Sequence, residues 1–421
     1  MAPTPQRDLL DAVWSYPLFE AVYGRRSRRF GLGFEMPEGP FRYRSAHVSL
    51  PLSELEEALL VGAGAGFSGL PFWDLPTPSP YPNRSGRTFG TTRGGGHTKL
   101  FFTNDDGLYF LDDDVAATKL REIETADERE KVLTTFRTQR RQLQRGRLDI
   151  PRRAPTLSAH DHWESNRPGS TLFLPVCDVS ASLISLIAQF VDPALRRYAA
   201  SGRGLNIVDD RNGNRPAGTD RWLKSGFLDS ESILPLSLVE RQACYYIISE
   251  PATICQNMFL ATEALGLGGW KHCGFLSLEI LERMGFRIAR STGALPNNPI
   301  GLDGVFEASC PPYHSTMDAA VEAVLASYSP DDAPKVVPHR VPEAEYRAGA
   351  IRRLSDEGLA CTKAVCNYIL DTFDRFPGGM DAMHLAWAFQ AHHIDTDYYD
   401  RFFGPGAYGP THAEHMAKWH R

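Results

Sequence analysis

The sequence predicts a fold that mixes α-helices with antiparallel strands, and three segments indicate it. Residues 53–61 begin with Ser-Glu-Leu-Glu, the spacing of a helix capping box. Residues 252–265 repeat apolar side chains at helical spacing and are followed by a glycine. Residues 99–111 read as strand, Asn-Asp-Asp-Gly turn and strand, so they predict an antiparallel hairpin.

The remaining elements follow from the same rules. The helix over 252–265 is expected to begin near Pro251, because proline favours a first turn and breaks a helix interior. Residues 113–145 are charged and contain no glycine or proline, which predicts a long and largely exposed helix. Apolar runs at 171–176 and 286–289 predict strands.

Composition excludes several classes of protein. The 421 residues are 42% hydrophobic and carry a net charge of only -6, so a packed core is expected and nucleic acid is a poor partner. No apolar run reaches the roughly 18 residues of a membrane-spanning helix, and the start lacks the apolar stretch of a secretory signal. Seven scattered cysteines without a C-x-x-C pair favour a reducing compartment. We therefore expect a cytoplasmic protein without membrane partners.

A dinucleotide motif appears at residues 64–69, where Gly-Ala-Gly-Phe-Ser-Gly matches G-x-G-x-x-G. That motif binds phosphate only when a strand precedes the glycines and a helix follows them. Here a predicted helix precedes and a proline-rich stretch follows. We interpret the segment as a glycine-rich helix end.

Residues 330–421 are predicted to form a mostly helical C-terminal extension to a domain of residues 1–329, packed on that domain or across a dimer. Within it, residues 343–421 hold six of the chain's 13 histidines, which raises the possibility of a metal-binding protein (His384, His392, His393, His412, His415 and His420). Adjacent histidines in a helix point about 100° apart, and a single i, i+3 pair gives too few ligands for a closed site. We therefore predict no metal site, and expect chelators to leave the protein unchanged.

The densest cationic cluster is Arg25-Arg26-Ser27-Arg28-Arg29. Guanidinium forks and a serine hydroxyl suit a phosphate monoester, although a solvated basic turn has the same composition. A second segment, residues 86–97, is rich in glycine and leads into the hairpin, and glycine permits close backbone approach to a flat ligand. The third is the helix end at residues 256–274.

Together these segments resemble the nitroreductase superfamily of flavin mononucleotide (FMN) enzymes. The resemblance rests on the R-x-S-x-R spacing, the glycine-bearing loop and the run Gln-Asn-Met-Phe-Leu-Ala-Thr-Glu-Ala-Leu-Gly-Leu-Gly at 256–268, and covers roughly residues 8–290. Within the superfamily the order and spacing of the hairpin, Gly107-Leu108-Tyr109 included, look most like the azoline dehydrogenase branch. The resemblance implies a nitroreductase-type α+β fold, a mostly antiparallel central sheet flanked by helices, and a homodimer.

The resemblance also implies roles for individual residues. Arg25, Ser27 and Arg29 would hold the FMN phosphate, with Arg26 near the ribityl chain or ring. Arg28 is expected to matter less, because alternate residues of an extended segment face the ligand. Further ring contacts would come from two more segments (Thr91, Thr92, Arg93, Cys273 and Gly274). We expect the Cys273 thiol to be a small buried group rather than a reactive one. No catalytic acid or base is predicted.

The leading hypothesis is therefore an FMN-dependent oxidoreductase that transfers hydride or electrons between a donor, NADH or NADPH, and an organic substrate. The substrate would be a small molecule or a heterocycle in a modified peptide. A second hypothesis is a protein that sequesters FMN without turnover, and the metal-binding protein is a third.

Overall fold

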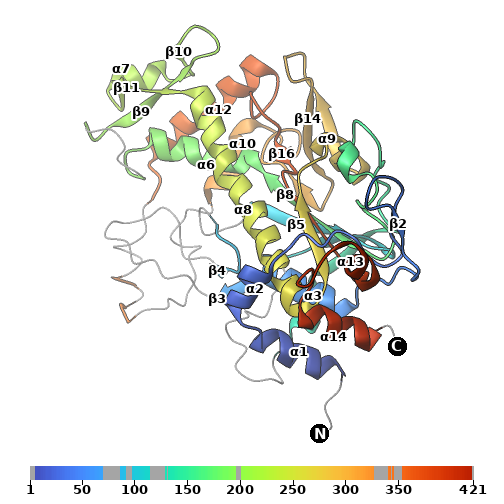
Figure 1. The fold of residues 1–421 in the computed structure, drawn as a ribbon. Coiled ribbons are helices and arrows are strands. Elements are labelled where there is room, and N and C mark those ends of the chain that lie inside the picture. The colour runs from blue at the N-terminus through green and yellow to red at the C-terminus, as the bar shows by residue number, and fades with distance from the viewer. Residues whose placement is uncertain are drawn as a thin grey trace.

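The computed structural model describes residues 5–69, 86–91, 97–113, 129, 131–195, 201–326, 340–342, 344–345 and 353–419. In this part of the chain the largest sheet has the order β12-β17-β8-β5-β6-β7, and each neighbouring pair is antiparallel. Figure 1 labels two of its inner strands, β8 and β5, in the middle of the molecule. Its strands are β5 (Thr98–Thr103), β6 (Gly107–Leu111), β7 (Arg140–Arg145), β8 (Thr171–Asp178), β12 (Gly268–His272) and β17 (Ala388–His392), and β16 (Met383–His384) pairs with β8. The predicted α+β fold with a mostly antiparallel central sheet is confirmed.

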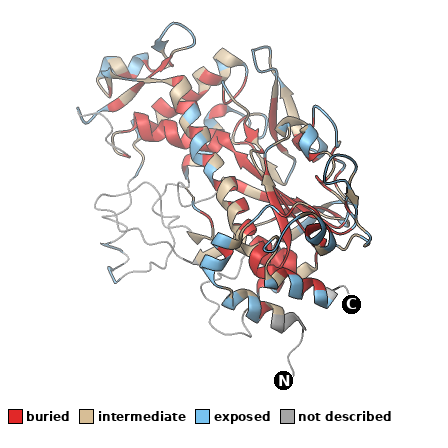
Figure 2. Cartoon of the chain, in the orientation of Figure 1, coloured by how far each residue is buried: buried red, intermediate tan, exposed pale blue. Residues whose placement is uncertain are grey.

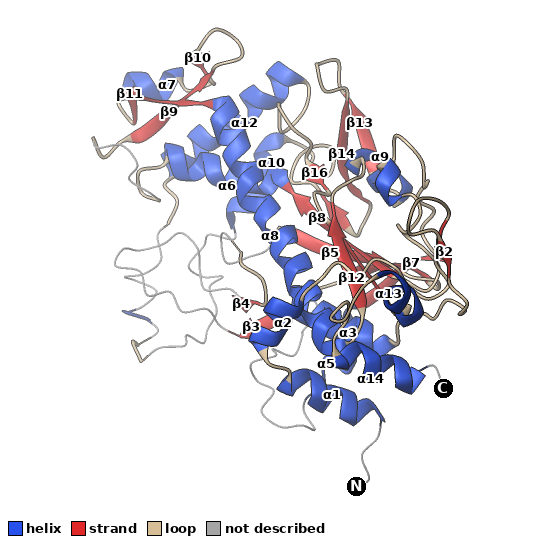
Figure 3. Ribbon diagram, viewed as in Figure 1, coloured by secondary structure: helices blue, strands red, loops and turns tan. Residues whose placement is uncertain are grey.

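Helices cover both faces of this sheet (Figure 3). Side chains alternate along a strand, so Phe101 packs with one set of helices while Leu100 and Phe102 pack with the other. The first set includes α6 (Val179–Val191), α10 (Met317–Ala326) and α12 (Asp356–Phe373), and the second includes α3 (Glu54–Ala65) and α5 (Lys131–Gln139). Figure 2 shows the buried residues of these helices and strands meeting in the interior.

The helix predicted to begin near Pro251 begins fifteen residues earlier. α8 spans Leu236–Leu265, and Pro251 lies inside it, so the predicted start is wrong. Proline has no N–H for the carbonyl four residues before it, that of Ile247. The Cys177 thiol donates to this carbonyl over 3.8 Å, which replaces part of the missing contact. A proline is tolerated here because buried side chains anchor the helix in the turns before and after Pro251.

The long helix predicted over residues 113–145 is also wrong for its last part. α5 ends at Gln139, and residues 140–145 form β7, which pairs with β6 at the edge of the sheet. α5 is amphipathic, and its buried side chains include Val132 and Phe136. The charged sequence of β7 is typical of an edge strand, because charges there discourage pairing with other molecules.

The C-terminal segment supplies helices and also a strand of the central sheet. Its helices are α12, α13 (Thr396–Phe402) and α14 (Pro410–Trp419), as predicted for a mostly helical segment. β17, however, lies between β12 and β8, with all five of its residues buried. The polar side chain of Gln390 is accommodated there because it bonds the Asn166 N–H (2.6 Å) and the Glu164 carbonyl (2.9 Å). The domain boundary near residue 330 remains a prediction, since residues 327–339 lie outside the described part.

The other described elements surround this core. No helix among the described residues has the length and apolarity that crossing a membrane requires. A three-stranded sheet of order β10-β9-β11 lies at one end, and β13-β14-β15 forms another. The remaining bounds are α1 (Pro5–Ser15), α2 (Leu18–Gly24), β1 (Glu35–Met36), β2 (Tyr43–Arg44), β3 (Phe67–Gly69), β4 (Gly86–Arg87), β9 (Gly204–Asp209), β10 (Arg215–Pro216), α7 (Asp220–Ser225), β11 (Leu228–Pro235), α9 (Ser277–Arg283), β13 (Arg287–Arg290), β14 (Asn297–Leu302), β15 (Phe306–Glu307) and a 3-10 turn at Ala159–Asp161.

Candidate functional site

The last turns of α8 bring together the three segments singled out in the sequence. Ile254, Met258 and Leu265 face the core, and Gly266 ends the helix at φ 71°, a conformation that favours glycine. The arginine cluster lies against this end of the helix through Glu263. The glycine-bearing loop reaches it through Asn257, whose amide donates to the Thr88 carbonyl over 2.7 Å. The third segment continues directly from the helix into β12.

The arginines of the cluster divide into outward and inward groups. Arg25 is half-buried, with its guanidinium 4.7 Å from the centre of the Phe259 ring. Arg26 and Ser27 are exposed, and the Arg26 guanidinium donates to the carbonyls of Tyr23 and Arg25. Among the described residues, no carboxylate forms a salt bridge with the Arg25 or Arg26 guanidinium.

Arg28 is instead buried in a salt bridge. Its guanidinium lies 2.6 Å from a Glu263 carboxylate oxygen, and the two side chains are 4% and 3% exposed. Two backbone carbonyls, those of Ala407 and Gly24, accept further hydrogen bonds from it. Burial raises the pKa of Glu263, and the adjacent Arg28 opposes that rise. Arg28 therefore anchors the segment and faces away from solvent.

Arg29 also turns toward protein carboxylates. It donates to Asp161 and to Glu164, each over 2.7 Å, and lies 4.2 Å from the centre of the Trp270 ring. Trp270 in turn stacks on His272 at 4.0 Å, and burial lowers the pKa of His272 to about 3. Because two acids already neutralise it, Arg29 is less suited to a phosphate than Arg25 and Arg26.

Cys273 and Gly274 directly follow β12, and Gly274 lies beside the same acidic group. Ser158 N–H donates to the Gly274 carbonyl over 2.7 Å, and a Cβ added to Gly274 would lie 2.3 Å from an Asp161 carboxylate oxygen. A side chain at this position would therefore displace the Asp161 carboxylate. Cys273 is exposed, so the expectation of a buried thiol is wrong. All seven cysteines are free thiols.

The glycine-bearing loop is described only in part. Arg87 forms a salt bridge with Asp113, Phe89 is buried, and Thr91 is half-buried. Thr92 and Arg93, two of the predicted ring contacts, lie outside the described residues. Thr88 therefore lies against α8, whereas residues 92–96 lie outside the described part of the chain.

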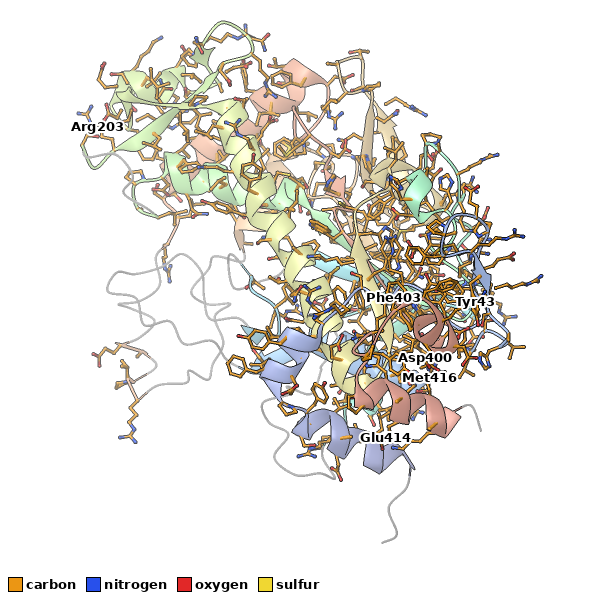
Figure 4. All side chains as sticks on the ribbon, viewed as in Figure 1. Tyr43, Arg203, Asp400, Phe403, Glu414 and Met416 are labelled. Carbon is orange, nitrogen blue, oxygen red and sulfur yellow. The ribbon has the colours of Figure 1, made fainter. Side chains whose placement is uncertain are left out.

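The N-terminal segment beyond the arginines is held by the C-terminal one. Leu32 N–H donates to the His393 carbonyl (3.0 Å), and Phe30 stacks on Tyr398 at 4.1 Å. Phe30, Tyr398 and Met416 belong to one buried cluster, with Tyr43 packed against it. Figure 4 shows Tyr43, Phe403 and Met416 around α13 and α14, whereas Arg203 lies at the opposite end of the molecule. The C-terminal segment thus fixes the position of the arginine cluster.

Several residues of this site are not indicated by any pattern in the sequence. Asp161, Glu164 and Glu263 neutralise two of the arginines, and Trp270 and His272 form the surface under Arg29. No spacing in the sequence connects these acids to the cluster. Their contacts with the arginines depend on elements that are distant in the sequence and meet in the folded chain.

Comparison with known proteins adds little to this description. No protein family and no curated protein matches the sequence. Among solved structures, one described as a candidate nitroreductase from Ralstonia eutropha JMP134 is similar over 65% of this chain and 77% of that chain, at 13% identity and a TM-score of 0.27. A likeness this weak carries no argument, so the proposals below rest on this chain's own residues.

Proposed function

We propose that this chain binds FMN and acts as an FMN-dependent oxidoreductase of the nitroreductase type, on a small or peptide-borne organic substrate. The observation that carries the proposal is that three segments far apart in the sequence are linked by direct contacts. Asn257 and Glu263 of α8 bond the loop at Thr88 and the arginine cluster, and Arg29 and Gly274 both lie beside Asp161. A single ligand that contacts all three segments requires them to be neighbours in this way.

The phosphate end of the ligand is assigned to Arg25, Arg26 and Ser27. A phosphate monoester carries up to two negative charges, and two guanidinium groups without a carboxylate partner in the described part of the chain match that charge. The serine hydroxyl adds a neutral donor beside them. Arg29, paired with two acids, is reassigned to a positioning role: it holds Asp161 and β12, and thereby the backbone at Gly274.

The ring end is assigned to Cys273 and Gly274, together with Thr91, Thr92 and Arg93. A donor near the reactive nitrogen of a flavin stabilises its reduced form, and a backbone amide supplies such a donor without a titrating side chain. FMN held there would supply the chemistry of hydride transfer between NADH or NADPH and the substrate. The part assigned to the protein is binding, orientation and hydrogen bonding.

An FMN-sequestering protein is the rival within the same site, and one measurement separates the two. The purified protein is expected to be yellow and to release FMN on denaturation. Anaerobic NADH or NADPH should then bleach the flavin absorbance of an oxidoreductase. Bound flavin that no donor bleaches would favour storage, and absence of FMN binding at micromolar protein would contradict the proposal.

The phosphate assignment predicts the effect of Arg25→Ala. Loss of one charge-assisted contact should weaken FMN binding by roughly 1.5–3 kcal/mol, about tenfold or more. Fluorescence titration of the flavin-free protein measures this. Arg203→Ala is the matched control, because Arg203 is exposed at the opposite end of the molecule and should leave FMN affinity unchanged. Equal affinity of wild type and Arg25→Ala would remove Arg25 from the site.

We also propose a homodimer, with the surface of α2 beside the arginine cluster as its interface. Four apolar side chains of this short helix are exposed, among them Phe19 (70%) and Tyr23 (74%). A row of exposed apolar groups next to a ligand site is typical of a surface that a partner covers.

The dimer proposal predicts that Phe19→Glu yields a monomer, because a charge would replace an apolar contact. Light scattering at micromolar concentration measures the mass of wild type and variant. Ile233→Glu, an exposed position on β11, is the control and should remain dimeric. A monomeric wild type with FMN bound would contradict the proposal.

A further inference from the structure

Three titratable side chains from distant parts of the chain meet in the interior. Glu56 lies in the first turn of α3, His393 directly follows β17, and His415 lies in α14. Their side chains are 0%, 2% and 5% exposed. One ligand atom from each lies within 4.8 Å of those of the other two.

The nitrogen and oxygen atoms of the cluster are close enough to share an ion. His415 Nε2 lies 2.9 Å from His393 Nδ1 and 3.3 Å from Glu56 Oε1. Ligands on one tetrahedral zinc, bound at about 2.0–2.2 Å, are separated by roughly 3.3 Å. The histidine pair would need to open by only a few tenths of an ångström.

The other atoms of two of these side chains are already fixed by the protein. Glu56 Oε2 accepts hydrogen bonds from the Ser53 N–H (2.6 Å) and hydroxyl (2.8 Å), the capping box of α3. His393 Nε2 lies 3.3 Å from the Pro51 carbonyl, and donation to this carbonyl leaves the lone pair on Nδ1. Metal-bound histidines are commonly oriented by such a bond from the second ring nitrogen.

The charge of the cluster is incomplete without a cation. Glu56 Oε1 is buried and has no hydrogen-bond partner within the described residues, because its contact with His415 lacks hydrogen-bond geometry. No lysine or arginine of the described part forms a salt bridge with Glu56, whose ion-pair partners there are the two histidines. A divalent ion would neutralise the carboxylate and use the histidines as neutral ligands.

We propose that Glu56, His393 and His415 bind one Zn²⁺ ion, with a water molecule completing the coordination. Two imidazole nitrogens and one carboxylate oxygen form a ligand set that zinc takes in proteins. The ion would tie α14 and the end of β17 to α3. It thereby holds the segment that packs on the arginine cluster.

The two arguments against a metal site in the sequence do not apply to this cluster. Only one histidine of each close pair takes part: the ring of His392 lies against Phe34, and His412 Nε2 contacts the Leu267 carbonyl. The third ligand, Glu56, comes from more than 300 residues away in the chain. The proposal therefore replaces the expectation that chelators leave the protein unchanged.

The test is metal analysis of untagged protein, purified without a metal-affinity column. We expect close to one zinc per chain, its removal by a strong chelator with a fall in melting temperature, and recovery on titration with zinc sulfate alone. Glu56→Gln and His415→Gln should each weaken zinc binding at least tenfold. His412→Gln is the matched control, a buried histidine one turn away in α14, and should retain the metal.

The opposite results are equally definite. Folded wild-type protein that binds no stoichiometric zinc would overturn the proposal and leave a hydrogen-bonded cluster in its place. Equal affinity in wild type and Glu56→Gln would do the same. If the variants do not fold, Co²⁺ bound to the wild-type chain decides: the visible spectrum of four-coordinate cobalt supports the site, and its absence refutes it.

Discussion

A chain truncated after Pro330 is expected to fail to fold. The cut removes β17, an interior strand, and leaves the facing edges of β8 and β12 without partners. It also removes Phe389, which is fully buried and packs against Phe173 and Phe259. Loss of one such phenylalanine side chain costs about 3–5 kcal/mol, whereas a whole domain is stable by only about 5–15 kcal/mol. Losing the entire strand exceeds that margin.

Soluble yield and far-ultraviolet circular dichroism measure this outcome. The matched control is a cut after Gly409, which removes α14 but keeps β17 and should preserve most of the secondary structure. A soluble 1–330 fragment that melts cooperatively would mean that the C-terminal segment is a separable addition. Such a result would contradict the position of β17 in the sheet.

The elements that could be predicted from the sequence are those whose signals are local. The helix that begins at Glu54 is indicated by a serine and a glutamate three residues apart, and both capping hydrogen bonds are present. The hairpin of β5 and β6 follows from a turn sequence between two apolar runs. In each case the residues that carry the signal also make the contacts.

The predictions that are wrong concern segments where tertiary contacts override a local sequence pattern. β17 has neither the alternation of a half-buried strand nor a turn signal at its ends, and the side chain of Gln390 in its middle is stabilised by hydrogen bonds to Glu164 and Asn166. A proline such as Pro251 normally marks a helix start, but buried side chains in the turns before and after it keep α8 continuous. The basic run 140–145 is compatible with a helix surface and with an edge strand, and pairing with β6 decides between them.

The candidate site shows the same division. The arginine cluster is visible in the sequence, but which guanidinium groups are neutralised is not. Arg28 meets Glu263 across 235 residues, and Arg29 meets Asp161 across 132. Such pairings follow from the folded topology. For the same reason the sequence could identify a phosphate-binding composition but not separate Arg25 and Arg26 from their inward neighbours.

Arg28→Ala is expected to destabilise the flavin-free protein by about 3–5 kcal/mol, far more than Arg26→Ala. Removal of one partner of a buried salt bridge leaves the other charge without compensation. Glu263 would keep only a long contact with the Arg26 N–H, at 3.4 Å, and the carbonyls of Ala407 and Gly24 would lose a donor. Arg26 is exposed, so its replacement should change stability by about 0.5 kcal/mol or less. Urea denaturation without FMN measures both, because bound ligand would add its own stabilisation.

Two further measurements separate the unpaired charge from the loss of packing. Arg28→Met combined with Glu263→Leu removes both charges and should recover much of the lost stability, since an apolar pair of similar size avoids the desolvation cost. Burial already raises the pKa of Glu263 in the native protein, and loss of Arg28 removes an opposing influence. The folded state of Arg28→Ala then binds the proton more tightly than the unfolded state does, so its stability should fall as pH rises above the unfolded carboxyl pKa and recover on acidification. A deficit that is independent of pH, and that the double variant does not repair, would mean that Arg28 acts through packing rather than through its charge.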